Sequence, residues 1–279
     1  MAAVLILSPD ALIIRSLHAD PWTVLLWRGV LTATGIVALA WVIVRRGPRP
    51  FTGPAVQVTL LGAVFFSGAT VAFVTSLRRT DVANVLVIVG AGPLFAAILS
   101  RVFLREDIPR RTWVASLSVV VGLAVILAGS LQHGSLVGDL IAVAGSLCFA
   151  AFLTTVRRAG EASMLPALAI AGLITACVAV VAGAGLRPPP SDVPLLLILG
   201  LVILPVSLTL TTRAARDLPA PEVSLVSRIE TLLGPFWVWL AVGEIPAVEV
   251  VVGGLLIVVA ASLHSLSALR AERHQARTT

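Results

Sequence analysis

Charged side chains inside long apolar stretches are the residues of this sequence that could do chemistry. Arg228 and Glu230 lie within the apolar run 222–242, and Arg28 lies within the run 22–44. A charge in such a run is costly, so it normally faces protein or water and marks a functional pathway. Arg228 and Glu230 are two residues apart and do not share a helix face, so we expect at least one of them to contact another helix.

We expect Arg28, Arg228 and Glu230 to line a central cavity, in which the arginines hold an anionic group such as a carboxylate. Glu230 would then pair with a cationic group or accept a proton. The alternative is a structural ion pair that holds the run 222–242 against a neighbouring helix. Trp237 lies deep in the same run and could face the substrate, with packing or an interfacial aromatic belt as the alternative roles.

Asp10 is the other candidate for proton coupling. It follows Pro9 in the short apolar run 2–17, and Arg15 is five residues further on. If this run spans a membrane, Asp10 is an intramembrane acid that could relay protons. If the run is only partly inserted, Asp10 is a solvated loop residue. The run is shorter and more polar than the others. This indicates a first helix that is truncated or broken, or a chain start that was assigned too late.

The composition determines where these charges must lie. Hydrophobic residues make up 58% of the chain and charged residues 12%, whereas an ordinary soluble domain has about 25% charged residues. The mean hydropathy is +1.04. Such a chain predicts a polytopic membrane protein with the lipid bilayer as its partner. The net charge of +6 is carried by arginines between the apolar runs, which favours a role in membrane topology over nucleic-acid binding.

Ten apolar runs could form membrane-spanning helices, each of which needs about 20 mostly apolar residues. The sequence therefore predicts an all-α integral membrane protein with ten transmembrane helices. Pro93 and Pro235 fall inside two of the runs, where a proline kinks the helix and could assist bending. The runs are 2–17, 22–44, 55–77, 82–104, 112–130, 139–156, 165–184, 194–214, 222–242 and 248–266.

The runs divide into two halves of five, at residues 1–130 and 139–267, followed by a tail at 268–279. Glu106 and Glu244 each follow a long run, and the same register places Arg78 opposite Arg216. An odd number of spans per half makes the second half enter the membrane from the opposite side, which is the inverted-repeat pattern of secondary transporters. Most arginines lie on the side of the termini, so we expect both termini in the cytoplasm.

The sequence contains no motif for enzymatic catalysis, nucleotide binding or metal binding, and we expect neither a cofactor nor a metal. An intramembrane enzyme acting on a lipid or isoprenoid is the main rival interpretation. Such enzymes usually need acidic clusters that bind Mg²⁺, and the apolar runs offer no pair of aspartates. A non-transporting structural subunit is a third interpretation, which the charges in the apolar runs disfavour.

Three segments carry a resemblance to a known family. They are Trp27-Arg28, the stretch Ala-Gly-Pro-Leu-Phe-Ala-Ala at 91–97 that leads to Glu106, and Glu-Thr-Leu-Leu-Gly-Pro at 230–235, which leads to Gly243-Glu244. With them the sequence resembles the EamA-type branch of the drug/metabolite transporter superfamily over nearly its whole length. The first helix departs from the family pattern because it is shorter and more polar.

This resemblance implies ten helices in two inverted repeats, cytoplasmic termini, and movement of small metabolites across the cell inner membrane. We therefore expect a secondary-active permease for a small metabolite or drug, amino-acid-like or another organic solute. It would work by alternating access, in the direction of export, and would be driven by protons or by substrate exchange. A homodimer is compatible with this interpretation.

Overall fold

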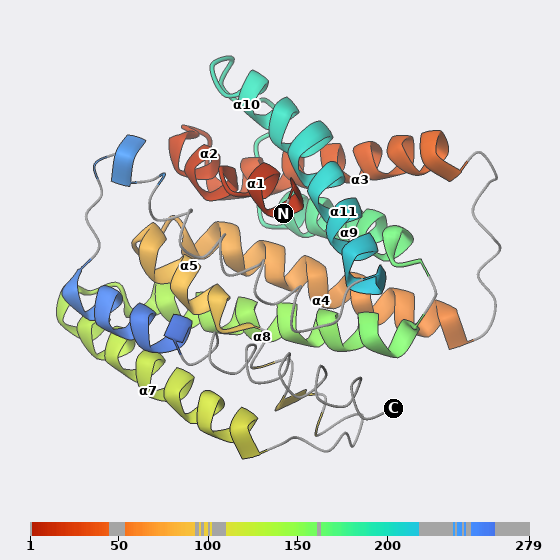
Figure 1. Ribbon diagram of the computed structural model, residues 1–279. Helices are drawn as coiled ribbons and strands as arrows, with labels where there is room; N and C mark the ends of the chain where they lie inside the picture. The colour runs from red at the N-terminus through yellow and green to blue at the C-terminus, as the bar shows by residue number, and fades with distance from the viewer. Residues whose placement is uncertain are drawn as a thin grey trace, which may run out of the picture.

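The computed structural model describes residues 2–44, 54–92, 95, 98–99, 101, 110–160, 163–217, 237, 239–241, 243 and 247–259. Within these residues every regular element is a helix (Figure 1). The helices are α1 (Ala2–Leu7), α2 (Asp10–Ser16), α3 (Pro21–Val44), α4 (Pro54–Ser76), α5 (Val82–Gly90), α7 (Arg110–His133), α8 (Leu136–Ala159), α9 (Leu165–Val181), α10 (Val193–Leu197), the π-helical segment η1 (Ile198–Ile203), α11 (Leu204–Asp217) and a last helix, Val248–Val259.

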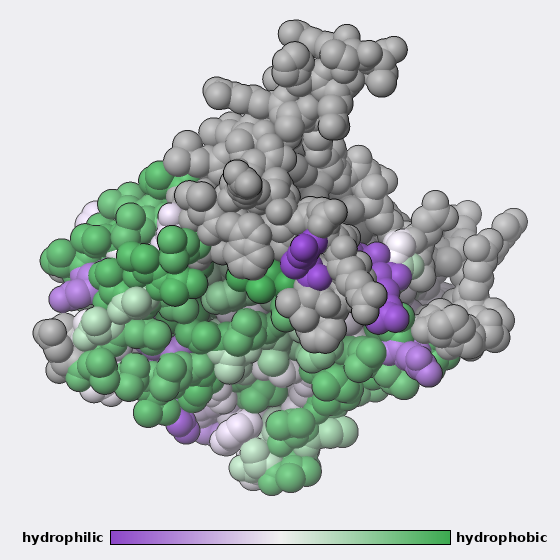
Figure 2. Space-filling view, turned by 90° about the horizontal axis from the view of Figure 1, so that it is seen from below, coloured by the Kyte–Doolittle hydropathy of each residue, from purple (hydrophilic) through white to green (hydrophobic). Residues whose placement is uncertain are grey.

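Among the described residues, four helices are long and apolar enough to cross a membrane: Pro21–Trp41, Val56–Ser76, Leu136–Ala159 and Val193–Thr211. The expected runs 22–44 and 55–77 agree with α3 and α4 to within one residue at each end. Large apolar side chains such as Leu173, Val181 and Leu255 are exposed. Figure 2 shows that most of the described surface in this view is hydrophobic, as lipid contact requires.

The first apolar run is a broken helix. Helices α1 and α2 meet at Ser8 and Pro9, which form a turn between them. Pro9 has no backbone N–H to continue the α1 ladder, but its carbonyl accepts the N–H of Ile13 at 2.9 Å and so begins α2. Of the alternatives open for this run, the described residues therefore form a helix interrupted in its middle.

The run expected at 194–214 also departs from a regular helix. It begins as α10, continues as η1 and ends as α11. A π-helical segment widens the helix locally and is frequent at functional sites. The segment lies close to α3, since a Cβ added to Gly200 would lie 2.4 Å from Leu31 Cβ and one added to Gly35 would lie 2.6 Å from Pro205 Cγ. Nothing in the periodicity of this apolar run predicts the π-helical segment.

Two helix pairs cross at glycines so closely that no side chain fits between them. A Cβ on Gly29 of α3 would lie 2.4 Å from the carbonyl oxygen of Gly172 on α9, and a Cβ on Gly172 would lie 2.6 Å from the carbonyl oxygen of Gly29. Gly122 of α7 and Gly253 of the last helix show the same reciprocal contact, at 2.7 and 2.6 Å. Small residues at such crossings allow helix backbones to approach in membranes.

The remaining packing places α4 between α8 and α9, while α3 lies along α9 and η1, and α1 packs against α11 (Figure 1). The larger cluster of buried side chains includes Ile14, Leu25, Val74 and Leu77, so α2, α3 and α4 share one core. The expected kink positions Pro93 and Pro235, and the predicted site residues Arg228 and Glu230, lie outside the described residues.

Candidate functional site

The break between α1 and α2 sets the position of Asp10. Asp10 is the first residue of α2 and is 7% exposed. A carboxylate in the first turn of a helix is stabilised by the positive end of the helix dipole. Asp10 is therefore a buried acid within the first apolar run, and the alternative of a solvated loop residue does not apply.

Arg28 is the partner of Asp10. It projects from α3 and is also 7% exposed. Its Nη2 donates to Asp10 Oδ2 at 2.9 Å, and its Nη1 donates to Asp10 Oδ1. The guanidinium carbon lies 6.0 Å from the centre of the Phe73 ring on α4. A bidentate pair of this kind is the strongest arrangement of a guanidinium and a carboxylate, and it joins α2 to α3 in the core.

Trp237 reaches the same break from the C-terminal half of the chain. Its indole Nε1 donates to Ser8 Oγ at 3.2 Å, and Ser8 Oγ donates to the carbonyl oxygen of Leu5 at 2.9 Å. Three of the residues singled out from the sequence, Asp10, Arg28 and Trp237, thus surround one turn of backbone. The sequence did not predict the pairing of Asp10 with Arg28, because it placed Arg28 with Arg228 and Glu230 and showed only Arg15 near Asp10.

A small cavity adjoins Arg28. Its volume is about 20 Å³, and Arg28 and Gly29 of α3 face Gly172 and Thr175 of α9 across it. Thr32 Oγ1, which also lines this cavity, is buried and has no hydrogen-bond partner among the described residues. A space of this size holds about one water molecule. The described core around Arg28 is therefore closed to an organic solute in this conformation.

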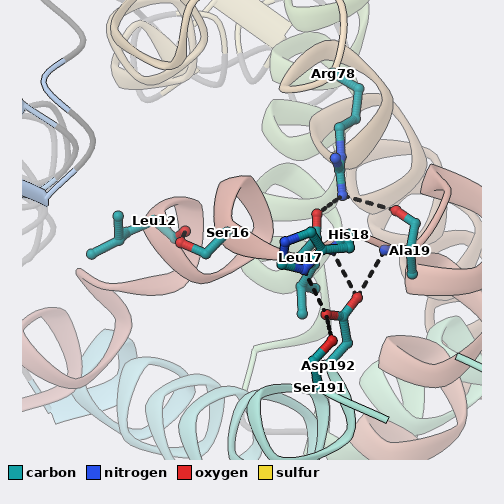
Figure 3. Close-up of polar contacts among 8 residues, drawn as sticks. All are labelled: Leu12, Ser16, Leu17, His18, Ala19, Arg78, Ser191 and Asp192. Carbon is teal, nitrogen blue, oxygen red and sulfur yellow. Dashed lines mark hydrogen bonds and ion pairs between the residues drawn. The ribbon is translucent and has the colours of Figure 1, made fainter. Parts of the chain in front are cut away.

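A second polar network lies at the end of the bundle where α3 begins and α9 ends (Figure 3). Asp192, just before α10, is 1% exposed. Its Oδ2 accepts the backbone N–H groups of His18 and Ala19 at 2.8 Å each, and its Oδ1 lies 3.2 Å from His18 Nδ1. Arg78 Nη2 donates to the carbonyl oxygens of Leu17 and Ala19 at 2.8 and 3.0 Å. The loop between α2 and α3 is thereby tied to two other parts of the chain.

Two acids at this end of the bundle, Asp192 and Asp20 in the loop between α2 and α3, are adapted to the charged form. Burial alone would raise the pKa of Asp192, but hydrogen bonds from Ala19, His18 and Ser191 outweigh it and hold that pKa below its usual value. Burial would likewise raise the pKa of Asp20, but hydrogen bonds from Thr23 and Trp22 outweigh this effect and lower that pKa below its usual value. A lowered carboxyl pKa stabilises the fold above the unfolded-state pKa, and this contribution is lost as the pH falls through the folded-state pKa.

We expect Asp192→Asn to loosen the loop between α2 and α3. The change removes the negative charge that accepts two backbone N–H groups, at a cost of about 1–3 kcal/mol. The measurement is the labelling rate of an Ala19→Cys variant, free of Cys148 and Cys177, with a membrane-impermeant thiol reagent. Labelling should accelerate in Asp192→Asn. In the Asp192 protein the labelling rate, corrected for the fraction of the thiol that is ionised, should accelerate only below the usual carboxyl pKa of about 3.9.

The control for this experiment is Arg187→Gln. Arg187 is exposed and lies, like Asp192, in the loop between α9 and α10. It should leave the labelling rate unchanged at every pH. Equal labelling rates in Asp192→Asn and its parent would show that Asp192 does not hold the loop.

A third group of polar side chains surrounds Asp139, which is 0% exposed in the first turn of α8. Its carboxylate accepts hydrogen bonds from Thr80 Oγ1, Ser130 Oγ and, at 2.9 Å, Asn84 Nδ2. Asp139 was expected only as the first residue of an apolar run. Its position at the start of that run, after a glycine-containing turn, was the signal that could have identified it as a helix-start acid.

Comparisons with known proteins show similarity to a transporter family in the N-terminal half of the chain. Residues 1–128 match the model of the EamA-like transporter family. A protein described as "Uncharacterized transporter YyaM", from Bacillus subtilis (strain 168), is 30% identical over 109 residues. The match covers 37% of this chain and 36% of that relative, so the chain spans about a third of the curated relative it matches.

The fold is also found among solved structures. A chain described as "Crystal structure of protein" superimposes with a TM-score of 0.69 and covers 96% of this chain and 95% of its own length. At 17% sequence identity this likeness concerns the fold alone. The matching family model is described as one of transporters, which disfavours the interpretation as an intramembrane enzyme. Residues 1–128 of this chain are thus similar to the EamA-like transporter family, as both the family model and the relative from Bacillus subtilis indicate.

Proposed function

We propose that this chain is a secondary-active permease that moves a small organic solute across the cell inner membrane by alternating access, with Asp10 and Arg28 as its proton-coupling pair. The observation that carries the proposal is a bidentate ion pair, 7% exposed on both sides, at the break of the first helix. An intramembrane ion pair at an interrupted helix is the kind of site at which transporters bind solutes and coupling ions.

Electrostatics couple the proton to the solute at this pair. An anionic group of the solute can replace Asp10 as the partner of Arg28 only if Asp10 becomes neutral, because two carboxylates would otherwise share one guanidinium. Asp10 cannot take up a proton without a new anion for Arg28, because a buried unpaired charge costs about 3–5 kcal/mol. The occupied site therefore carries the solute anion and the proton together.

The direction of transport follows from this linkage. A proton gradient directed into the cell drives uptake of an anionic solute with one proton. Export, which is the direction inferred from the family resemblance, occurs when the outward gradient of the solute exceeds the proton gradient. Arg228, Glu230 and Trp237 complete the proposed solute site, and Pro93 and Pro235 are the proposed bending points.

The packing supports two inverted repeats at residues 1–130 and 139–267. A two-fold axis between the repeats would exchange the second run with the seventh and the fifth with the tenth. Helices exchanged by such an axis are expected to pack against each other, as α3 does with α9 at Gly29 and Gly172, and α7 with the last helix at Gly122 and Gly253. The same axis would exchange α4 with α11, in the third and eighth runs, and α1 with α8, in the first and sixth runs. The contact of α4 with α8 would then correspond to the contact of α11 with α1, and both contacts are present.

The arginine distribution supports cytoplasmic termini, with the tail 268–279 in the cytoplasm. The end that holds Asp192 and the loop between α2 and α3 then faces outward. The π-helical segment η1 and the break between α1 and α2 are irregular points at which helices can change shape during alternating access.

The test of the proposed function is transport by the purified protein in proteoliposomes, with a panel of carboxylates, amino acids and cationic drugs. We expect accumulation of at least one solute that depends on the pH gradient and collapses when a protonophore is added. Arg158→Gln, an exposed change at the end of α8, serves as the control and should transport at the wild-type rate. Failure of every solute to move, with or without a gradient, would contradict the proposal.

A further inference from the structure

A cavity of about 390 Å³ lies at the end of the bundle that holds the Asp192 network, away from Asp10 and Arg28. Its walls come from α2, the turn between α4 and α5, α7 and the last helix. It is large enough for a small organic molecule, whose sites usually begin at about 300 Å³. Ile126, Ala247 and Val250 give one side of it an apolar surface.

Three arginines line this cavity: Arg15, Arg78 and Arg79. Arg15 Nη1 donates to the carbonyl oxygen of Leu77 at 2.9 Å, which anchors it beside the turn that carries Arg78. The Nε of Arg78 is buried and has no hydrogen-bond partner among the described residues. Burial and the nearby charge of Arg15 lower the pKa of Arg78. Arg15 and Arg78 therefore repel each other, although Asp192 and Asp20 offset part of this repulsion and Asp81 also lines the cavity. A bound anion would relieve what remains of it.

The floor of the cavity offers a hydrogen-bond acceptor. Asn84 is 3% exposed and lines the cavity. Its Nδ2 faces Asp139 at 2.9 Å and approaches the hydroxyls of Thr80 and Ser130 at 3.3 Å each. Because these contacts fix the amide orientation, its buried Oδ1 has no hydrogen-bond partner among the described residues. A buried acceptor without a donor is costly, so a ligand N–H group would be favoured here.

Glu249 supplies a negative charge on the wall formed by the last helix. Its side chain packs against Gly129 of α7, where an added Cβ would lie 2.9 Å from Glu249 Cβ and Cγ. The closeness of the two helices therefore determines where the Glu249 carboxylate can lie. The cavity combines three arginines, a buried acceptor and two carboxylates, Asp81 beside the arginines and Glu249 on the last helix.

We propose that this cavity is a second solute site, at the outer end of the pathway, which binds a small organic anion through its carboxylate and favours one that also carries an ammonium group. Arg79, Arg78 and Arg15 bind the carboxylate, while Asn84 Oδ1 and Glu249 receive the ammonium group. The role of the site as an entry or exit station rests on the proposed permease function, but the binding itself does not.

The test is binding of three ligands with one carbon skeleton to the purified full-length protein in detergent, measured by calorimetry. Leucine carries both charged groups, 4-methylpentanoate lacks the ammonium group, and isoamylamine lacks the carboxylate. We expect leucine to bind tightest, 4-methylpentanoate about 10-fold more weakly, and isoamylamine not at all, since each charge-assisted contact contributes about a factor of ten. Equal binding of all three, or no binding of either carboxylate, would overturn the proposal.

Two substitutions localise the site. Arg79→Gln should weaken both carboxylates about 10-fold, and the exposed side chain of Arg79 makes the change safe for folding. Glu249→Gln should weaken leucine about 10-fold while leaving 4-methylpentanoate unchanged or tighter. Arg187→Gln, an exposed arginine outside the cavity lining, is the matched control and should bind all ligands as the wild type does.

The outcome distinguishes this site from the proposed function. If the ligand and variant dependence holds but the protein transports nothing, the site stands and the permease proposal fails. If transport is normal and Arg79→Gln binds leucine as the wild type does, the site is refuted and the permease proposal stands.

Discussion

Replacing Asp10 by asparagine is expected to abolish accumulation driven by the pH gradient, by at least about 100-fold, while exchange of the solute across the membrane continues. Asparagine keeps the size of the side chain, but it cannot take up and release a proton beside Arg28 as aspartate can. The guanidinium is then permanently available to the solute anion, so exchange needs no protonation step. The loss of about 100-fold corresponds to removal of roughly 2.7 kcal/mol of coupling.

Arg28→Ala is expected to abolish both accumulation and exchange, because the solute anion loses its cationic partner. Arg28→Lys should retain weak exchange only, since lysine keeps the charge but cannot form the bidentate contact. The measurements are uptake driven by an imposed pH gradient and solute counterflow, both in proteoliposomes. Full gradient-driven accumulation by Asp10→Asn would contradict the role of Asp10.

The same variants separate a structural role of the pair from a functional one. Each single change leaves a buried charge without its partner and should lower the free energy of unfolding by about 3–5 kcal/mol. The double variant Asp10→Asn with Arg28→Gln removes both charges and should recover much of this stability without recovering transport. Recovery of transport in the double variant would mean that the ion pair only holds α2 against α3.

The second large effect is expected at the crossing of α3 and α9. Gly29→Ala places a Cβ 2.4 Å from the Gly172 carbonyl oxygen and 3.0 Å from the Ala176 nitrogen, both of which are backbone atoms. The two helices must separate, which should destabilise the protein by about 1–3 kcal/mol, and Gly29→Leu should prevent folding. Thermal unfolding in detergent measures the first change, and the yield of monodisperse protein measures the second.

Gly92→Ala is the matched control for this crossing. Its Cβ would meet Phe149 and Ser146 at 3.5 and 3.6 Å, which is ordinary contact, so its melting temperature should equal that of the wild type. Because Arg28 directly precedes Gly29, the separation should also displace Arg28 from Asp10 and reduce transport in any Gly29→Ala protein that folds. An unchanged melting temperature in Gly29→Ala would refute the close crossing.

The helix positions could be predicted from the sequence because a lipid environment demands a long apolar run for every span. Charged and proline-rich loops then delimit the runs sharply, as Pro54 shows at the start of α4. The break at Ser8 and Pro9 was one of the expected alternatives, since a proline beside a polar residue interrupts a helix. The π-helical segment, which packs against Gly35 and Leu31, was not predictable, because it leaves no trace in the pattern of an apolar run.

The candidate site was predicted in its members but not in its contacts. Asp10 and Arg28 were recognisable because charges in apolar runs are rare. Their pairing depends on the angle at which the first two helices cross, which sequence spacing does not contain. For the same reason the attachment of Asp192 to His18, which are 174 residues apart, could not be foreseen. The predicted pairing of Arg28 with Arg228 and Glu230 stays a prediction.

The most direct test of proton coupling at Asp10 is the pH change that follows solute binding to the purified protein in weakly buffered detergent solution. If an anionic solute displaces Asp10 from Arg28, the wild-type protein should take up close to one proton per bound solute, and Asp10→Asn should take up none. Solute binding without proton uptake by the wild type, or equal uptake by Asp10→Asn, would contradict the account.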